Sequence, residues 1–428
     1  MNKWLALSGL YIVQGLPHGF FGQAMPALMR KQGMDLTIIG LLSLLALPWA
    51  LKFIWAPWLD RISLRKQEFR RSWILTMNYS AVAVLVVIAS QPLDLWTGQA
   101  MAVFVGLLLM LNTLMATQDI ATDAMAVENL PPEQRGIGNG IQVAGYRVGM
   151  ILAGGALVSL YPLLGWQNSL LLLALLMLLG SLPLWWFKPQ PHVVDRQPLW
   201  PLWLGFFRLK HAAFWLLFLL VYKFGDAFGT PMIRPMLSDA GVTLEQMGLI
   251  LGTVGFLAGL LGALGGGWLV GKLGRQSALL GFLLLEALAL LSYLGLQPAA
   301  GQAPDWLHIY LAVIVEHIAG GMATAALFTV MMDRCREHCA AADYALQSCL
   351  VIIAGMLAGA LSGFSAKTLG YDGHFVLSAI LCVAAMSAVW ALVQRGLLPS
   401  RKALVGAGAG AADKTTRQND QAKRTGKR

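Results

Sequence analysis

Long apolar stretches recur along almost the whole chain, and they constrain its fold more than any other feature. About 20 apolar residues are enough for a helix to cross the hydrocarbon core of a membrane. Because 57% of the residues are hydrophobic and only 12% are charged, against about 25% charged residues in soluble domains, a soluble or mostly disordered protein is excluded. The predicted spans are twelve, near 4–30, 38–59, 72–91, 99–128, 138–162, 164–187, 212–237, 244–271, 277–296, 306–333, 342–366 and 373–394.

The positions of Lys and Arg predict the orientation of these spans. If both termini are cytoplasmic, the inward segments carry 24 of these residues and the outward loops carry three, Arg30, Lys31 and Lys367. Basic residues accumulate on the cytoplasmic side of membrane proteins. We therefore expect a multi-pass protein with both termini in the cytoplasm. Most of the +10 net charge then reflects this asymmetry and a basic tail, and no nucleic-acid partner is expected.

An internal repeat divides the spans into two sets of six. The segment 33–41 is similar to 241–249 at an offset of 208 residues, and Met-Ala-Thr at 115–117 recurs at 322–324. Duplicated six-span units are typical of transporters built from two bundles. The predicted domains are an N-terminal six-helix bundle (1–187), a cytoplasmic linker with an amphipathic helix (188–211), a C-terminal six-helix bundle (212–394) and a disordered basic cytoplasmic tail (395–428).

Ionisable residues inside the N-terminal spans are candidates for function, because a charge in the hydrocarbon core is costly. Asp119 and Asp123 are four residues apart and share one helix face. Two carboxylates so close resist joint ionisation, so one of them could hold a proton near neutral pH. Arg147, at equal depth on the next span, is expected to pair with Asp119, either to couple transport or only to join helices. Lys52 lies near a span end and is expected to extend its ammonium to the surface.

The C-terminal spans hold a second group of ionisable residues. Lys223 and Asp226 are three residues apart and are expected to pair near the middle of the membrane. Glu316 is the preferred proton carrier of its span, because the adjacent His317 points about 100° away. Glu286 has no nearby cation in the sequence.

His18 occupies the position of the first repeat that is equivalent to Asp226, 208 residues later. It follows Gly15 and Pro17, so we expect the helix to be interrupted there, which would free backbone groups to meet a ligand.

Sequence patterns typical of metal sites and enzymes are weak or missing. Cys335, His338 and Cys339 lie close together, but a structural zinc site usually needs four ligands, so no metal site and no cofactor are expected. The sequence has no phosphate-binding loop and no catalytic spacing such as His-Glu-x-x-His. We therefore do not expect an enzyme, and a membrane-bound enzyme or sensor is kept as the alternative from another class.

Two predicted loops resemble the signature of the major facilitator superfamily. The segment 267–275 (Gly-Trp-Leu-Val-Gly-Lys-Leu-Gly-Arg) is similar to its Gly-x-Leu-x-Asp-Arg-x-Gly-Arg loop, with Gly271 in place of Asp. Asp60 and Arg61 keep the acidic and basic residues of the equivalent loop in the first half. The resemblance implies an all-α membrane protein with twelve transmembrane helices in two six-helix bundles. It also implies a cytoplasmic gate at Asp60, Arg61, Lys272 and Arg275.

Further motifs resemble the muropeptide permease (AmpG-type) branch, which includes siderophore permeases of the rhizobactin and pyochelin type. They include Gln-Gly-Leu-Pro at 14–17, Ala-Thr-Gln-Asp-Ile-Ala-Thr-Asp-Ala at 116–124 and Gly-Tyr-Arg-Val-Gly-Met at 145–150. Muropeptide permeases have two additional spans, and the segment 14–23 looks more like the siderophore group. Length and this motif therefore favour the siderophore permeases.

The resemblance implies a bacterial inner-membrane secondary transporter. We expect it to import a ferric siderophore or similar metal chelate by alternating access, coupled to protons. The alternatives are a muropeptide permease for cell-wall recycling and, after that, multidrug efflux. The expected partners are the metal chelate, protons and membrane lipids, and the chain is expected to be a monomer.

The site residues predicted from these arguments fall into three sets. Substrate binding is assigned to Gln14, His18, Gln23, Tyr146, Lys223, Asp226, Arg234 and Glu316. Proton coupling or ion pairing is assigned to Asp119, Asp123, Arg147, Glu316 and His317. The cytoplasmic gate is assigned to Asp60, Arg61, Lys272 and Arg275.

Overall fold

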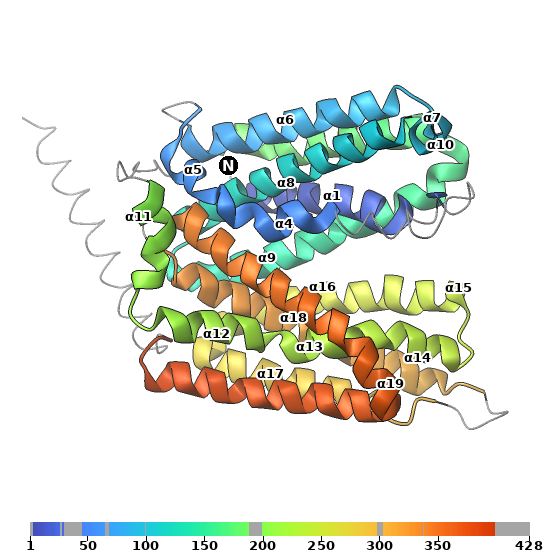
Figure 1. Cartoon of the computed structure of the whole chain (residues 1–428), viewed down its shortest axis with the longest axis vertical. Helices are drawn as coiled ribbons and strands as arrows, with labels where there is room; N and C mark the ends of the chain where they lie inside the picture. Colours follow the sequence, from blue (N-terminus) through green and yellow to red (C-terminus); the bar gives the residue numbers. More distant parts are fainter. Residues whose placement is uncertain are drawn as a thin grey trace, which may run out of the picture.

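Helices make up nearly the whole of the described chain (Figure 1). The computed structural model describes residues 3–25, 28–29, 45–64, 68–98, 100–187, 199–297, 303–336 and 338–398. The predicted loop at 30–37, the start of the second predicted span, most of the linker before residue 199 and the tail beyond residue 398 lie outside the described residues. Apolar residues occur on all sides of the long helices, as expected where lipid or other helices surround them.

The N-terminal half forms one group of helices, several of which are interrupted by 3-10 or π segments. Its elements are α1 (Lys3–Pro17), η1 (His18–Ala24), α4 (Leu47–Leu51), η3 (Lys52–Ile54), α5 (Ala56–Arg61), α6 (Phe69–Ala89), α7 (Leu93–Thr97), α8 (Met101–Asn129), α9 (Pro132–Ile151), η4 (Leu152–Ala156), α10 (Leu157–Ser181) and η5 (Leu182–Trp185). The first span departs from α geometry at His18, directly after Pro17, as the sequence predicts.

The C-terminal half forms the second group, preceded by a short helix at the end of the linker. Its elements are α11 (Leu199–Leu204), η6 (Gly205–Arg208), α12 (Ala212–Tyr222), α13 (Phe224–Gly229), η7 (Thr230–Met232), α14 (Ile233–Asp239), α15 (Leu244–Met247), η8 (Gly248–Gly255), α16 (Phe256–Leu273), α17 (Arg275–Leu291), α18 (Trp306–Asp333) and α19 (Ala340–Gln394). The seventh predicted span is thus broken at Lys223, between α12 and α13.

Seven helical segments of the described part are long and apolar enough to cross a membrane. Two of the long helices turn sharply at a glycine. Gly165 in α10 has φ of 69° and Gly370 in α19 has φ of 70°, values that glycine adopts readily because it has no Cβ. Gly370 lies in the predicted gap between the spans 342–366 and 373–394, and Gly165 lies next to the predicted gap between 138–162 and 164–187. These two turns therefore agree with the predicted borders of the spans.

The two groups of helices are joined at one end of the molecule and separate at the other (Figure 1). Near α5 and α11, one hydrophobic cluster takes residues from both groups, among them Leu59 and Leu219. At the opposite end each group has its own cluster, which includes Trp166 in the N-terminal group and Tyr293 in the C-terminal group. We call these the joined end and the separated end.

Glycines allow α9 to pack directly against α1. A Cβ on Gly149 would lie 2.1 Å from the carbonyl oxygen of Ile12, and a Cβ on Gly15 would lie 2.0 Å from the carbonyl oxygen of Tyr146. Small residues permit this close approach of helix backbones in membranes. The position of α9 relative to α1 therefore depends on these glycines.

Gly149→Ala should destabilise the folded protein by about 1–3 kcal/mol, because the added methyl group overpacks the contact between α1 and α9. Gly155→Ala is the matched control, since a Cβ there meets nothing within 4 Å. Thermal unfolding in detergent, followed by size-exclusion chromatography, measures the difference. Equal melting temperatures for the two variants would contradict the predicted contact.

Candidate functional site

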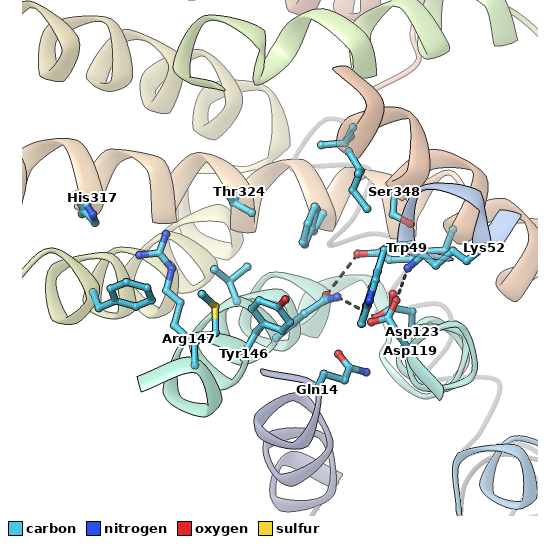
Figure 2. A pocket seen from close by; sticks show the side chains of 18 residues that line it. Gln14, Trp49, Lys52, Asp119, Asp123, Tyr146, Arg147, His317, Thr324 and Ser348 are labelled. Atoms are coloured by element: carbon cyan, nitrogen blue, oxygen red, sulfur yellow. Dashed lines mark hydrogen bonds and ion pairs between the residues drawn. The ribbon is translucent and has the colours of Figure 1, made fainter. Parts of the chain in front are cut away.

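A cavity of about 490 Å³ lies between the two groups of helices. Its wall is rich in aromatic and amide side chains and also holds the buried acidic residues of α8 (Figure 2). We call it the aromatic lobe. Its lining includes Gln14, Trp49, Lys52, Asp119, Asp123, Gln142, Tyr146, Phe256, Phe328, Tyr344 and Ser348.

A second cavity of about 310 Å³ adjoins the first and is lined mainly by charged side chains. Arg147, Phe256, His317 and Thr324 line both cavities, so the two are neighbouring parts of one site. We call the second cavity the charged lobe. Its ionisable lining residues are Arg147, Lys223, Asp226, Arg234, Glu316 and His317.

Lys52 forms a buried ion pair with Asp119 (Figure 2). The prediction that Lys52 extends to the surface is wrong, since only 2% of the residue is exposed. Lys52 lies in the 3-10 segment between α4 and α5, from which its side chain reaches α8. The predicted pair of Asp119 with Arg147 is also wrong, because Lys52 is the partner of this carboxylate.

Arg147 instead extends away from Asp119 and toward His317 (Figure 2). Its guanidinium occupies space left by Gly259 on α16, where a Cβ would lie 1.5 Å from the Nη1 atom. The depth of Arg147 in its span predicts that it lies near the site. The sequence could not predict the space at Gly259, because α16 belongs to the other half.

Asp123 is held by neutral donors. The Tyr11 hydroxyl donates to Asp123 at 3.2 Å and the Gln142 amide donates to it at 2.9 Å. Tyr344 of α19 in turn donates to the Gln142 side-chain oxygen at 3.4 Å. The chain of hydrogen bonds connects helices of both halves. Sequence reasoning missed Tyr11, Gln142 and Tyr344, because neutral polar residues carry no signal of burial or pairing.

Lys223 contacts two carboxylates in the other half. Its ammonium lies 2.7 Å from Asp226, which confirms the predicted pair, and it also pairs with Glu286 of α17. Glu286 has no nearby cation in the sequence, and the structure supplies one from 63 residues away. Lys223 sits at the break between α12 and α13, a position typical of discontinuous helices at transporter binding sites.

Glu316 and His317 contact each other although they are adjacent on α18. The His317 Nδ1 atom lies 2.5 Å from a Glu316 carboxylate oxygen, and both residues line the charged lobe. The expectation that only one of them faces the cavity is wrong, because both side chains are long enough to turn toward the same space.

Two cations of the charged lobe have no anionic partner within the described residues. Neither Arg147 nor Arg234 forms a hydrogen bond or ion pair with any residue that the structure describes, and both line the lobe. A guanidinium presents five N–H donors in a planar fork that fits carboxylate and phosphate groups. The lobe therefore presents two guanidinium groups to a ligand.

Among the predicted binding residues with described side chains, His18 lines neither cavity. His18 is exposed, and the centre of its ring lies 5.8 Å from the centre of the Tyr146 ring. The backbone of Gln23 belongs to η1, while its side chain lies outside the described part of the structure.

Polar contacts join the two halves at the joined end. Asp60 accepts hydrogen bonds from the backbone N–H groups of Ala341 (3.1 Å) and Ala342 (2.8 Å) at the start of α19. Asp333 of α18 pairs with Arg135 of α9 at 2.9 Å. Of the predicted gate residues, Asp60 and Arg275 are buried in this region, whereas Arg61 and Lys272 are exposed.

Arg275 connects both halves within the same region. It pairs with Asp333 at 2.8 Å and donates to the carbonyl oxygen of Pro132 at 2.5 Å. Sequence reasoning missed Arg135 and Asp333, although both lie at predicted loop borders where gate residues are found.

No group of three or more His, Cys, Asp or Glu side chains could hold a metal ion in the part of the chain described above. The four cysteines are free thiols.

Comparison with known proteins identifies the class of this fold. The model of the Major Facilitator Superfamily matches residues 7–342 and 220–419, and the chain belongs to this superfamily of membrane transporters. Within it, the chain belongs to the muropeptide permease branch. It is 32% identical over 396 residues to the anhydromuropeptide permease of Escherichia coli K12, with 87% of this chain and 76% of that protein covered.

Further relatives and solved structures agree with this assignment. The putative transporter AmpG 4 of Rickettsia felis is 24% identical over 392 residues, with 88% of this chain and 93% of that protein covered. The fucose:proton symporter of E. coli is similar in fold, with a TM-score of 0.67, 14% identity and coverage of 90% of this chain and 97% of that one. A bacterial homologue of the iron transporter ferroportin, described as outward-facing, has a TM-score of 0.64, 14% identity and coverage of 91% and 98%.

Removing one partner of the buried pair between Lys52 and Asp119 should destabilise the protein by about 3–5 kcal/mol, because it leaves an uncompensated buried charge. Lys52→Met should therefore unfold at a lower temperature than the double variant Lys52→Met, Asp119→Leu, which has no charge at either position. Lys367→Met, at an exposed lysine, serves as the control. If the double variant were no more stable than Lys52→Met, the pair would not be a direct one.

Proposed function

We propose that this protein imports anhydromuropeptides across the bacterial inner membrane, driven by protons. The observation that carries the proposal is the pair of unpartnered guanidinium groups, Arg147 and Arg234, in a cavity that adjoins an aromatic lobe. A muropeptide combines amino sugars with a short peptide that carries free carboxylates. The relatives named as permeases of this branch agree with such a substrate.

The charged lobe suits the peptide part of the substrate. A carboxylate that enters it would meet Arg147 and Arg234, and charge-assisted hydrogen bonds to guanidinium groups are stronger than neutral ones. Arg147 is partly buried, so leaving it without an anion is unfavourable, and a bound carboxylate removes that cost.

The aromatic lobe suits the sugar part. Aromatic rings such as those of Trp49 and Tyr146 offer flat apolar faces to the apolar side of a sugar ring, while Gln14 and Gln142 offer amide donors and acceptors. Binding sites of this kind combine apolar walls with a few placed polar groups.

The preference for a ferric siderophore receives no support from the named relatives. Chain length and the segment 14–23 are its basis, and neither identifies a chemical group that would recognise a siderophore. We therefore adopt the alternative reading, import of muropeptides for cell-wall recycling.

The two ends of the fold support a conformation that is open to the periplasm. The joined end contains the loops that the positive-inside pattern assigns to the cytoplasm, so the cavity would open toward the periplasm from the separated end. The ferroportin homologue of similar fold is described as outward-facing. Each proton that enters in excess of the negative charges on the substrate releases about 2.3 kcal/mol per 100 mV, enough for a roughly fifty-fold gradient.

Uptake of a radiolabelled anhydromuropeptide tests the proposal. Cells without their own muropeptide permease should accumulate the label when they express this chain and not with the empty vector. Arg147→Gln should lower uptake at least tenfold, because one charge-assisted hydrogen bond contributes about 1.5–3 kcal/mol. Uptake of a labelled ferric siderophore in place of the muropeptide would overturn the proposal.

The gate proposed at Asp60 is tested by the native thiol of Cys339, which is 5% exposed next to the joined end. Asp60→Ala removes the acceptor of two backbone N–H groups of α19, so the joined end should open more often. Maleimide should then label Cys339 several-fold faster than in the wild type. Glu133→Ala, at an exposed carboxylate of the same end, is the control, and an equal labelling rate in both variants would refute the gate.

A further inference from the structure

We propose that Glu286 binds the coupling proton, and that an anionic substrate group promotes this by replacing Glu286 as a partner of Lys223. The inference rests on the proposed function and extends it by naming the proton site. In this step the Glu286 carboxylate gains one proton and becomes a neutral acid, and no covalent bond to the substrate forms or breaks.

One ammonium shared by two carboxylates is the basis of the inference. Lys223 contacts both Asp226 and Glu286, so this buried trio carries one negative charge in excess when all three groups are ionised. The excess makes the trio the part of the charged lobe that gains most from one proton. In the other half, Lys52 pairs with Asp119, and the neighbouring Asp123 accepts hydrogen bonds from Tyr11 and Gln142.

Glu286 is the member of the trio that is harder to keep charged. Only 1% of its side chain is exposed, against 15% for Asp226. Its Oε2 atom is buried without a hydrogen-bond partner in the described structure, and an ionised carboxylate in such a place is costly. Asp226 lines the cavity, where water can solvate it. The proton therefore goes to Glu286.

The groups around Glu286 come from four helices. Lys223, at the break between α12 and α13, contacts Glu286 and also Asp226 of α13. Three further groups lie close enough to interact with Glu286 electrostatically: Tyr222 of α12, Glu316 of α18 and Cys382 of α19. Lys223 is the one cation among these groups. An anion that engages Lys223 thus changes the main favourable interaction of the charged form of Glu286.

Coupling follows from linkage between the two ligands. Lys223 lines the charged lobe, whereas Glu286 does not, so a substrate carboxylate meets the ammonium first. Competition for Lys223 weakens its pair with Glu286 and favours protonation. By reciprocity, protonation of Glu286 must strengthen binding of the anionic substrate by the same factor.

Purified wild-type protein in liposomes, with a labelled anhydromuropeptide as the probe, tests the inference. An inward proton gradient should accelerate wild-type accumulation several-fold. Glu286→Gln should lose this acceleration while it keeps exchange of external label for internal unlabelled substrate, because the amide mimics the protonated acid. Glu245→Gln, at an exposed carboxylate outside the site, should retain both properties.

A second measurement does not depend on the folding of a variant. Binding of the muropeptide to wild-type protein in weakly buffered detergent solution should take up a proton, detected by a pH indicator.

The possible outcomes separate the two proposals. If the wild type binds the muropeptide without proton uptake, or if Glu286→Gln keeps its response to the gradient, the role of Glu286 is refuted while muropeptide transport stands. Loss of the gradient response in Asp226→Asn, with exchange retained and Glu286→Gln still responsive, would assign the proton to Asp226 instead. If the wild type neither binds nor exchanges the muropeptide, both the proposed function and the role of Glu286 fall.

Discussion

The cost of placing a charge inside an apolar bundle governs the architecture around the cavity. In each half a lysine lowers that cost by forming ion pairs with carboxylates. Lys52 pairs with Asp119, and Lys223 pairs with Asp226 and Glu286. Because a buried charge without a partner is strongly destabilising, these contacts fix η3 against α8 and α13 against α17. The helices that line the site are thus positioned by the same groups that give it its polarity.

Polar contacts cross between the two halves at the joined end, whereas each half has its own hydrophobic cluster at the opposite end. At the joined end Asp60 caps the start of α19, where a helix N-terminus favours negative charge. Arg135 and Arg275 share Asp333 in the same region. The contacts of Asp60 with α19 and of Arg135 with Asp333 cross between halves that must separate if access is to alternate, whereas Arg275 and Asp333 both belong to the C-terminal half. The contacts between the halves are polar and hydrogen-bonded, so water can replace them when the end opens.

Spans, repeat and family were predictable from the sequence because apolar length and motif spacing are local properties. The pair of Lys223 with Asp226 was predictable for the same reason, since three residues on a helix determine proximity. The partners of Asp119 and Glu286 were not, because Lys52 and Lys223 lie 67 and 63 residues away from them. Packing of distant helices decides such pairs. Arg147 illustrates the limit, since its direction depends on the space at Gly259.

The cluster around Lys52 in the N-terminal half differs from the cluster around Lys223 in the C-terminal half, and the difference suggests different roles in transport. Lys52 pairs with Asp119, and the neighbouring Asp123 accepts hydrogen bonds from the neutral donors Tyr11 and Gln142. Lys223 faces two carboxylates beside the guanidinium groups of Arg147 and Arg234, so its partners can be redistributed when an anion enters. Glu286 shares its cation with Asp226 and has no neutral donor on its Oε2 atom in the described structure, and this difference from Asp123 is the basis of the proposed proton site in the C-terminal half.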